Sequence, residues 1–295
     1  ARTRYGAMPT AENGHVLAQS HARAVRTAQT LERLLDGMER APQRCLIYRE
    51  HLRLEPNAVH VLARYLKDLE SMHYFHEMAQ CCEDFLGTNG ANLSVNDEIS
   101  IRLTLHNIYD RELHRETDAL KHLTRAQQIG ALDPRVINAE IDRCRRRGQK
   151  KEQMTLMMAL IDALPASECV EPTLEYVRLC ESVHADMGMI VEVLRKTNAR
   201  YPNQLSILLE LRHYLRRTGQ TFELAAVLEK LAKVTTDLQT RRSILLEASE
   251  IQEKLGNHKL AQNLYDEAQL CSPINPVGKA DMPQTLRLGY GDMHT

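Results

Sequence analysis

The segment RRSILLEASEIQEKLGNHKLAQNLYDEAQLCSP, residues 241–273, decides the fold class of this chain. Its apolar residues recur three or four positions apart on both sides of Gly256, which is the spacing of amphipathic helices. Gly256 interrupts the pattern, so the segment predicts two helices joined by a short turn. One such hairpin cannot bury its apolar stripe alone, and we therefore expect further hairpins stacked against it.

The second half of this segment carries a family resemblance. After Gly256 come small, aromatic, small and proline residues at the offsets typical of the second helix of a tetratricopeptide repeat: Ala261, Tyr265, Ala268 and Pro273. The segment resembles that family, although Ala248 and Gln252 replace the larger leucine and tyrosine usual in its first helix. The resemblance extends over residues 42–273, and it implies a right-handed α-solenoid whose concave surface binds segments of other proteins.

The rest of the chain repeats the pattern less cleanly. Turns between paired helices are predicted near residues 73, 112, 148, 187, 219 and 256, and Gly87 to Ala91 is predicted to be a loop. Helix-forming residues dominate, with three Phe and no Trp, so the chain is predicted to be all-α with about seven antiparallel helical hairpins. We expect an extended arm at 1–12, a single array at 13–273 whose first helix, from about His15 to Met38, is an end cap, and an extended tail at 274–295.

Charge and cysteine content limit the environment. The formal net charge is −1, but residues 102–151 carry a basic excess between two acidic blocks. The seven cysteines form an odd set without a CxxC pair, which favours a reducing intracellular compartment. Basic residues outnumber acidic ones near the first residue, so a processed mitochondrial origin is one hypothesis and a cytoplasmic one the other. No apolar run is long enough to span a membrane.

Basic residues gather at three of the predicted turns and are the candidate partner-binding residues. They are Arg111, Arg115, Arg143, Arg145, Arg146, Arg147, Lys150, Lys151, Arg212, Arg216 and Arg217. Equivalent turns line one edge of a stacked array, so these clusters could form a ridge for RNA phosphate or for an acidic protein surface. The alternative is that they offset the helix macrodipole and stay solvated.

Sequence motifs give little support to catalysis or metal binding. His73, His76 and Glu77 lie near Cys81 and Cys82, but their spacing matches no metal-site pattern. A second group, His114, Asp118 and His122, is spaced for one helical face and is predicted to be solvated. We therefore expect no cofactor, no metal and no enzymatic activity.

The predicted function is that of a protein-binding scaffold. It would be a structural subunit of a larger intracellular, hetero-oligomeric complex, and that complex could be mitochondrial. The alternative is an organellar RNA-binding protein that uses the basic edge, because residues 134–165 faintly resemble a pentatricopeptide repeat. An enzyme or metal protein is a third hypothesis.

Overall fold

The structure is a computed structural model that describes residues 11–36 and 41–271. Within these ranges there are fourteen α-helices, a π-helical turn (η1), a 3-10 turn (η2) and no strand. The elements are α1 (Ala11–Asp36), α2 (Ala41–Leu54), α3 (Val59–Ser71), α4 (Phe75–Asn89), α5 (Val95–Asn107), η1 (Ile108–Glu112), α6 (Glu116–Gly130), α7 (Pro134–Arg147), α8 (Lys150–Ala163), η2 (Ala166–Glu168), α9 (Val170–Ser182), α10 (Met187–Arg200), α11 (Leu205–Arg217), α12 (Thr221–Val234), α13 (Leu238–Lys254) and α14 (His258–Leu270).

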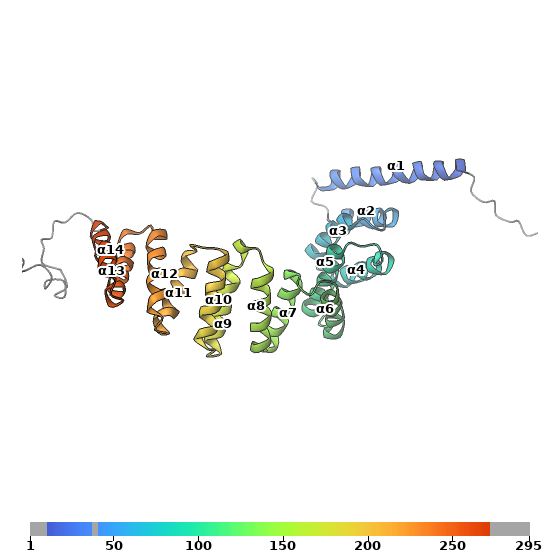
Figure 1. The fold of residues 1–295 in the computed structure, drawn as a ribbon. Helices are drawn as coiled ribbons and strands as arrows, with labels where there is room; N and C mark the ends of the chain where they lie inside the picture. Colours follow the sequence, from blue (N-terminus) through green and yellow to red (C-terminus); the bar gives the residue numbers. More distant parts are fainter. Residues whose placement is uncertain (1–10, 37–40, 272–295) are drawn as a thin grey trace, which may run out of the picture. The chain divides into compact units, whose positions relative to one another are not determined.

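The predicted all-α array is confirmed. Over the described residues the helices pack in seven consecutive pairs, from α1 with α2 to α13 with α14 (Figure 1). Residues 241–271 lie in the last pair, with Ala248, Ala261 and Ala268 buried where α13 and α14 meet. None of the described helices is long and apolar enough to cross a membrane.

The turn inside each pair from α3–α4 onward contains one residue with a positive φ angle. These residues are His73, His114, Gly148, His184, Gly219 and Gly256, each within three positions of a predicted turn. At Gly256 φ is 81°, a left-handed conformation that glycine adopts without the steric cost of a Cβ. Three of the six turns place histidine there instead, which a search for glycine alone would miss.

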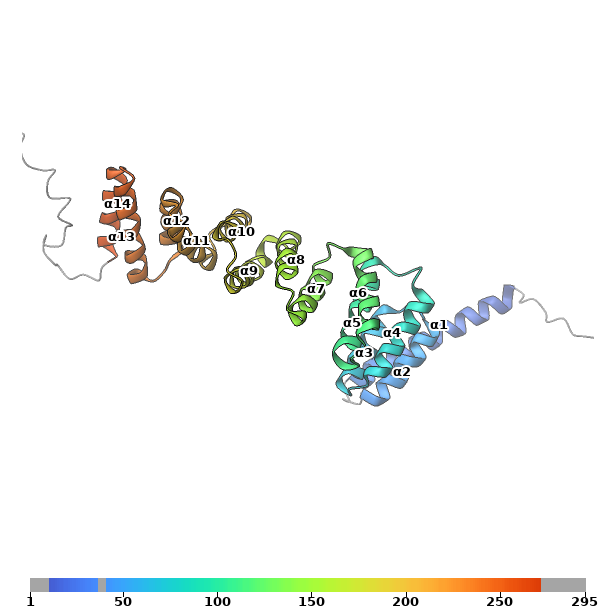
Figure 2. The same cartoon turned by 90° about the horizontal axis from the view of Figure 1, so that it is seen from below.

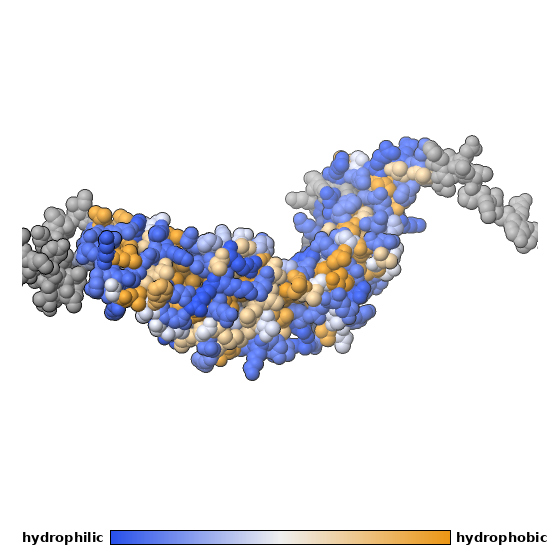
Figure 3. All heavy atoms as spheres, in the orientation of Figure 1, coloured by the Kyte–Doolittle hydropathy of each residue, from blue (hydrophilic) through white to orange (hydrophobic). Residues whose placement is uncertain are grey.

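The chain divides into two compact units, Ala1–Ala163 and Leu164–Thr295. In the first unit, one core cluster spans α2 to α6 and includes Leu62, Cys82 and Leu105. In the second, the six helices α9 to α14 lie as neighbouring pairs (Figure 2), with Leu194 and Leu228 fully buried. Each unit is thus itself a run of hairpins. Figure 3 shows apolar patches among the hydrophilic side chains that cover both.

The first helix, α1, is about twice as long as most of the others and packs on α2. It buries Val25 and Ala28, and the ring of His21 makes a 2.6 Å hydrogen bond to the carbonyl of Leu54 at the end of α2. Because α1 begins at Ala11, the last two residues of the predicted arm 1–12 are helical. Residues 1–10 and the predicted tail 274–295 lie outside the described residues.

The predicted loop from Gly87 to Ala91 is wrong in its first half, because α4 continues to Asn89. The hydroxyl of Thr88 donates to the carbonyl of Asp84 within the helix. The buried amide of Asn89 donates to the carbonyls of Phe85 and Pro56, at 3.2 and 2.6 Å. Tertiary hydrogen bonding of Asn89 therefore extends the helix past a local sequence that favours a turn.

Candidate functional site

The basic residues that the sequence marks as candidates for partner binding fall into two groups, one in each unit. The first unit holds eight of them around η1, the end of α7 and the start of α8: Arg111, Arg115, Arg143, Arg145, Arg146, Arg147, Lys150 and Lys151. The second unit holds three in the second half of α11: Arg212, Arg216 and Arg217.

Carboxylates of neighbouring helices neutralise the arginines at the end of α7. Arg146 forms an ion pair with Asp110 in η1, and Arg147 forms one with Glu116 at the start of α6. Both carboxylates lie about one repeat earlier in the sequence. These pairs join α7 to the hairpin before it, so Arg146 and Arg147 have a structural role.

The other arginines of this group are paired too. Arg143 donates to Glu140 at 2.6 Å, and the side chain of Glu140 is only 5% exposed. Arg145 and Arg111 both reach Asp142, at 3.0 and 3.3 Å. Arg115 pairs with Asp118 at 2.6 Å. The excess positive charge at this edge is therefore far smaller than the sequence count suggests.

A small hollow of about 200 Å³ lies between η1, α6 and α7, where these pairs converge. Arg143, Arg146 and Arg147 line it, but Asp110 and Glu116 line it as well. An anion entering this hollow would have to compete with carboxylates already bound to the arginines. The hollow is thus balanced in charge rather than basic.

In the second unit a single carboxylate pairs with two of the candidate partner-binding arginines. Glu247 on α13 accepts from both Arg212 and Arg216 on α11, and its side chain is 14% exposed. This bridge joins consecutive hairpins in the way that Arg146 and Arg147 do in the first unit. Arg217 lies beside it at the exposed end of α11.

A larger depression, which we call the α2–α4 groove, lies in the first unit and was not predicted. Its volume is about 420 Å³, and its lining residues come from α2, the turn after it, α3 and α4: Arg49, Leu52, Arg53, Pro56, Tyr65, Glu77, Gln80, Cys81, Asp84, Phe85, Thr88 and Asn89. The α4 residues recur over three turns of one helical face, so α4 forms a continuous wall. Just over one turn of α2, from Arg49 to Arg53, forms the opposite wall, and Tyr65 contributes from α3.

A hydrogen-bond network closes one end of the α2–α4 groove. The hydroxyl of Tyr65 donates to Glu77 at 2.6 Å, and Arg49 donates to both Tyr65 and Glu77. Burial, together with the hydrogen bond to Glu77, raises the pKa of Tyr65 to about 12. The phenol therefore stays protonated at neutral pH and keeps donating. This network joins α2, α3 and α4 and fixes the spacing of the two walls.

The thiol in the α2–α4 groove is not activated. Burial raises the pKa of Cys81 to about 12, with smaller contributions from the nearby carboxylates of Asp84 and Glu77. A thiol with such a pKa is protonated at neutral pH, whereas nucleophilic cysteines have lowered pKa values. Cys81 thus contributes apolar surface to the groove. Across the described residues there is no group of three His, Cys, Asp or Glu side chains placed to hold a metal ion.

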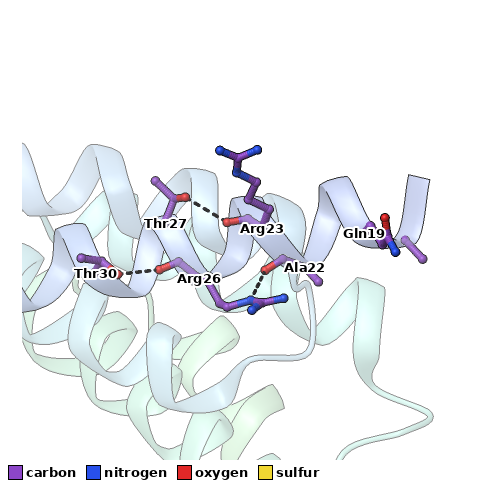
Figure 4. A pocket seen from close by; sticks show the side chains of 7 residues that line it. Gln19, Ala22, Arg23, Arg26, Thr27 and Thr30 are labelled. Atoms are coloured by element: carbon purple, nitrogen blue, oxygen red, sulfur yellow. Dashed lines mark hydrogen bonds between the residues drawn. The ribbon is translucent and has the colours of Figure 1, made fainter. Parts of the chain in front are cut away.

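Another hollow lies along α1, and the described residues lining it all come from that helix (Figure 4). Arg26 donates to the carbonyl of Ala22 at 3.3 Å, and the hydroxyls of Thr27 and Thr30 donate to carbonyls one turn earlier. These polar groups are bonded within their own helix. One helical face does not make a binding site, so we give this hollow no functional role.

The predicted solvated face of His114, Asp118 and His122 is wrong for His122, whose side chain is 1% exposed. Its Nε2 is 3.0 Å from Glu83 of α4, and its ring stacks on Tyr109 of η1. Its Nδ1 is buried without a hydrogen-bond partner, which favours the neutral ring with the proton on Nε2. His114 is exposed in the turn before α6. Because α6 begins only at Glu116, the predicted helical face breaks between these two histidines.

A second buried histidine lies nearby, and together they predict a pH-dependent stability. His106 hydrogen-bonds to the carbonyl of Ala119 through Nδ1 at 3.0 Å. Burial lowers the pKa of His106 and of His122, outweighing the opposing effects of the Ala119 carbonyl and of Glu83. Below about pH 6.5 the unfolded chain binds protons that the folded one excludes, so the free energy of unfolding should fall from pH 7 to pH 5.

Urea denaturation at a series of pH values would measure this. Each histidine should contribute a slope of up to about 1.4 kcal/mol per pH unit between the unfolded and folded pKa values. The charged groups around His122 are Glu83, Arg102 and Lys121. A variant with both His106→Gln and His122→Gln should show a flatter profile. An unchanged slope in that variant would contradict the assignment.

Comparisons with known proteins add a likeness of fold. No family model matches the chain, and no curated protein matches it. Among solved structures it is similar to the C-terminal part of a TPR repeat-containing protein from Cytophaga hutchinsonii, with 12% identity, a TM-score of 0.47 and coverage of 84% of this chain and 93% of that one.

Two further structures show the same degree of likeness. A tetratricopeptide repeat protein from Parabacteroides merdae has 11% identity and a TM-score of 0.43, covering 86% of this chain and 94% of that one. Yeast Tom70 has 11% identity and a TM-score of 0.42, covering 81% of this chain and 50% of that one. The class of this protein is accordingly defined by its own helices: an all-α repeat of helical hairpins.

Proposed function

We propose that this chain is a non-catalytic scaffold that binds a helical segment of a partner protein in the α2–α4 groove. The observation that supports the proposal is an apolar strip on the floor of this groove, between two polar helical walls. The strip is formed by Leu52 and Cys81, which are partly exposed, and by one edge of the groove lining at Phe85, which is only 6% exposed. A groove of about 420 Å³ is large enough to take several side chains of a peptide.

The form of the groove favours a helical occupant. Its α4 wall runs from Glu77 to Asn89, which corresponds to about 18 Å along a helix axis. A short amphipathic helix laid between α2 and α4 would bury its apolar face on the strip. Such a partner segment would complete the layer that α2, α3 and α4 begin.

The polar groups of the groove are arranged for binding rather than for reaction. Glu77 is held by Arg49 and Tyr65, and the Cys81 thiol is protonated at neutral pH. Neither side chain is placed as an activated base or nucleophile. Their roles in the proposal are to close one end of the groove and to line its floor.

RNA binding at the basic edge is the less favoured function. Carboxylates already pair with the arginines of α7, and a phosphate backbone would have to displace Asp110 and Glu116. Crosslinking of bound RNA to Lys150 or Lys151, at the start of α8, would be the result that favours it. Membership of a hetero-oligomeric complex, and a mitochondrial location, belong to the proposal as predictions from the sequence.

Site-specific photocrosslinking in cells tests the scaffold function. A photoreactive amino acid would replace Gln80 or Thr88, two exposed residues on the α4 wall, and as a control Lys67, an exposed residue of α3 outside the groove. We expect one and the same partner chain at Gln80 and Thr88, and not at Lys67. Crosslinks that are absent, or equal at all three positions, would overturn the proposal.

A further inference from the structure

The two walls of the α2–α4 groove carry opposite charges. On the α2 wall lie Arg49 and Arg53, and on the α4 wall lie Glu77 and Asp84. Arg49 and Glu77 are bound to each other, so they are not available to a partner. The charges left at the open part of the groove are therefore one basic residue on α2 and one acidic residue on α4.

Neither of these residues is held tightly by the protein. The side chain of Arg53 is 80% exposed, and its ion pair with Glu50 has a distance of 3.7 Å. An exposed pair of that length contributes almost nothing to stability, so a partner carboxylate can replace Glu50 at little cost. Asp84 is exposed and accepts from Gln80 through Oδ1, at 2.8 Å. Its other oxygen, Oδ2, can accept from a partner.

The two charges lie at nearby levels along the groove. Arg49 contacts Glu77 across it, and Asn89 donates to the carbonyl of Pro56 in the turn after α2, so α2 and α4 run in the same direction along the groove. Arg53 is one turn beyond Arg49, and Asp84 is two turns beyond Glu77. The apolar surface of Leu52, Cys81 and Phe85 lies between them.

From this arrangement we propose the chemistry of the occupant: an amphipathic helical segment of a partner protein that has an apolar anchor flanked, within one turn, by an acidic residue on one side and a basic residue on the other. The acidic residue pairs with Arg53 and the basic residue with Asp84. This proposal rests on the scaffold function proposed above. It adds a selection rule, by which we mean the pattern of apolar, acidic and basic residues that a bound segment must carry. Charge complementarity of this kind determines which partner binds, and in which direction, more than how tightly it binds.

Selection from a library of random 12-residue peptides displayed on phage tests the rule, with the full chain as the immobilised target. The wild-type chain should enrich peptides with an apolar residue between an acidic and a basic one. The Arg53→Glu variant makes both walls acidic and should enrich basic residues on both sides. The Asp84→Lys variant should enrich acidic ones, whereas Lys67→Glu on the exposed face of α3 should leave the selection unchanged.

Binding of one enriched peptide should follow the same rule. We expect Arg53→Glu to weaken it at least tenfold in low salt, and raising the salt to 0.5 M should shrink that ratio, because the Debye length falls to a few ångströms. Both substituted side chains are exposed, and a circular dichroism spectrum would show that each variant is folded. Unchanged selection in both charge variants would overturn the proposal.

The remaining outcomes separate this inference from the scaffold function. Thr88→Trp fills one end of the groove from an exposed position, so peptides that bind there should be lost in that variant. Peptides lost in Thr88→Trp but without the charge pattern would overturn the selection rule alone. If no enriched peptide is sensitive to Thr88→Trp, the groove itself fails as a binding site.

Two competition measurements deal with the other occupants. Competition by excess unlabelled chain would show that a second copy fills the groove. Competition by a synthetic peptide of residues 272–295 would show that the chain's own C-terminal segment does. Either result would replace the partner protein that we propose.

Discussion

Replacing Asp68 by alanine is expected to lower the free energy of unfolding of the first unit by about 3 kcal/mol, the typical cost of removing one partner from a buried ion pair. Asp68 on α3 accepts two 2.7 Å hydrogen bonds from Arg44 on α2, one from Nε and one from Nη2. The two side chains are only 11% and 14% exposed. Without Asp68 the largely buried guanidinium loses both of these hydrogen bonds.

The measurement is urea denaturation of the full chain, followed by circular dichroism. Glu50→Ala is the matched control, because it removes an ion pair from the same unit in which both side chains are largely exposed, and it should cost less than about 0.5 kcal/mol. Replacing the pair together, with Arg44→Met and Asp68→Leu, should recover much of the loss. If Asp68→Ala costs no more than Glu50→Ala, the pair does not hold α2 to α3.

The fold could be predicted because it depends on local patterns. Apolar residues at helical spacing and left-handed turn residues such as Gly148 and Gly256 act within a few positions of the chain. The end of α4 could not be predicted in this way, since it depends on a hydrogen bond from Asn89 to Pro56, 33 residues earlier. Where long-range contacts oppose a local preference, periodicity gives the wrong boundary.

The candidate site was less predictable, because the net charge of a cluster of basic side chains depends on which carboxylates pair with them in the fold. The arginines of α7 form a basic cluster in the sequence, yet Asp110 and Glu116 pair with them from 36 and 31 residues away. Arg212 and Glu247 are 35 residues apart and follow the same rule. These separations are close to one repeat, so a search for opposite charges one period apart would have found the bridges.

The α2–α4 groove had no such signal. Most of its lining comes from three helices, and those residues have ordinary explanations in their own helices: Leu52 and Phe85 as core, Arg53 and Asp84 as solvated surface. Only the packing of α2 and α4 on α3 brings them together. His122 was misassigned for a related reason, because the residue that buries it, Tyr109, lies in a π-helical turn that helical periodicity does not anticipate.

The second large effect is expected in the core of the second unit, from Leu228→Ala. Leu228 is fully buried in α12, which packs between α11 and α13. Truncating a buried leucine removes its transfer free energy and leaves a cavity, so we expect a loss of about 3 kcal/mol in the free energy of unfolding. Leu209→Ala in α11 is the control, since that side chain is 41% exposed and should lose under about 1 kcal/mol.

Amide hydrogen exchange would show which helices lose stability in the Leu228→Ala variant. In a repeat array each hairpin is stabilised mainly by its neighbours, so amide protection should fall most in α11, α12 and α13. The helices α3 and α4, which belong to the other compact unit, should keep theirs. An equal loss of protection in α3 and α12 would mean that the two units unfold as one, and the groove would then share its stability with the whole chain. Protection that persists in the first unit would instead let the α2–α4 groove hold the proposed partner segment while the second unit opens.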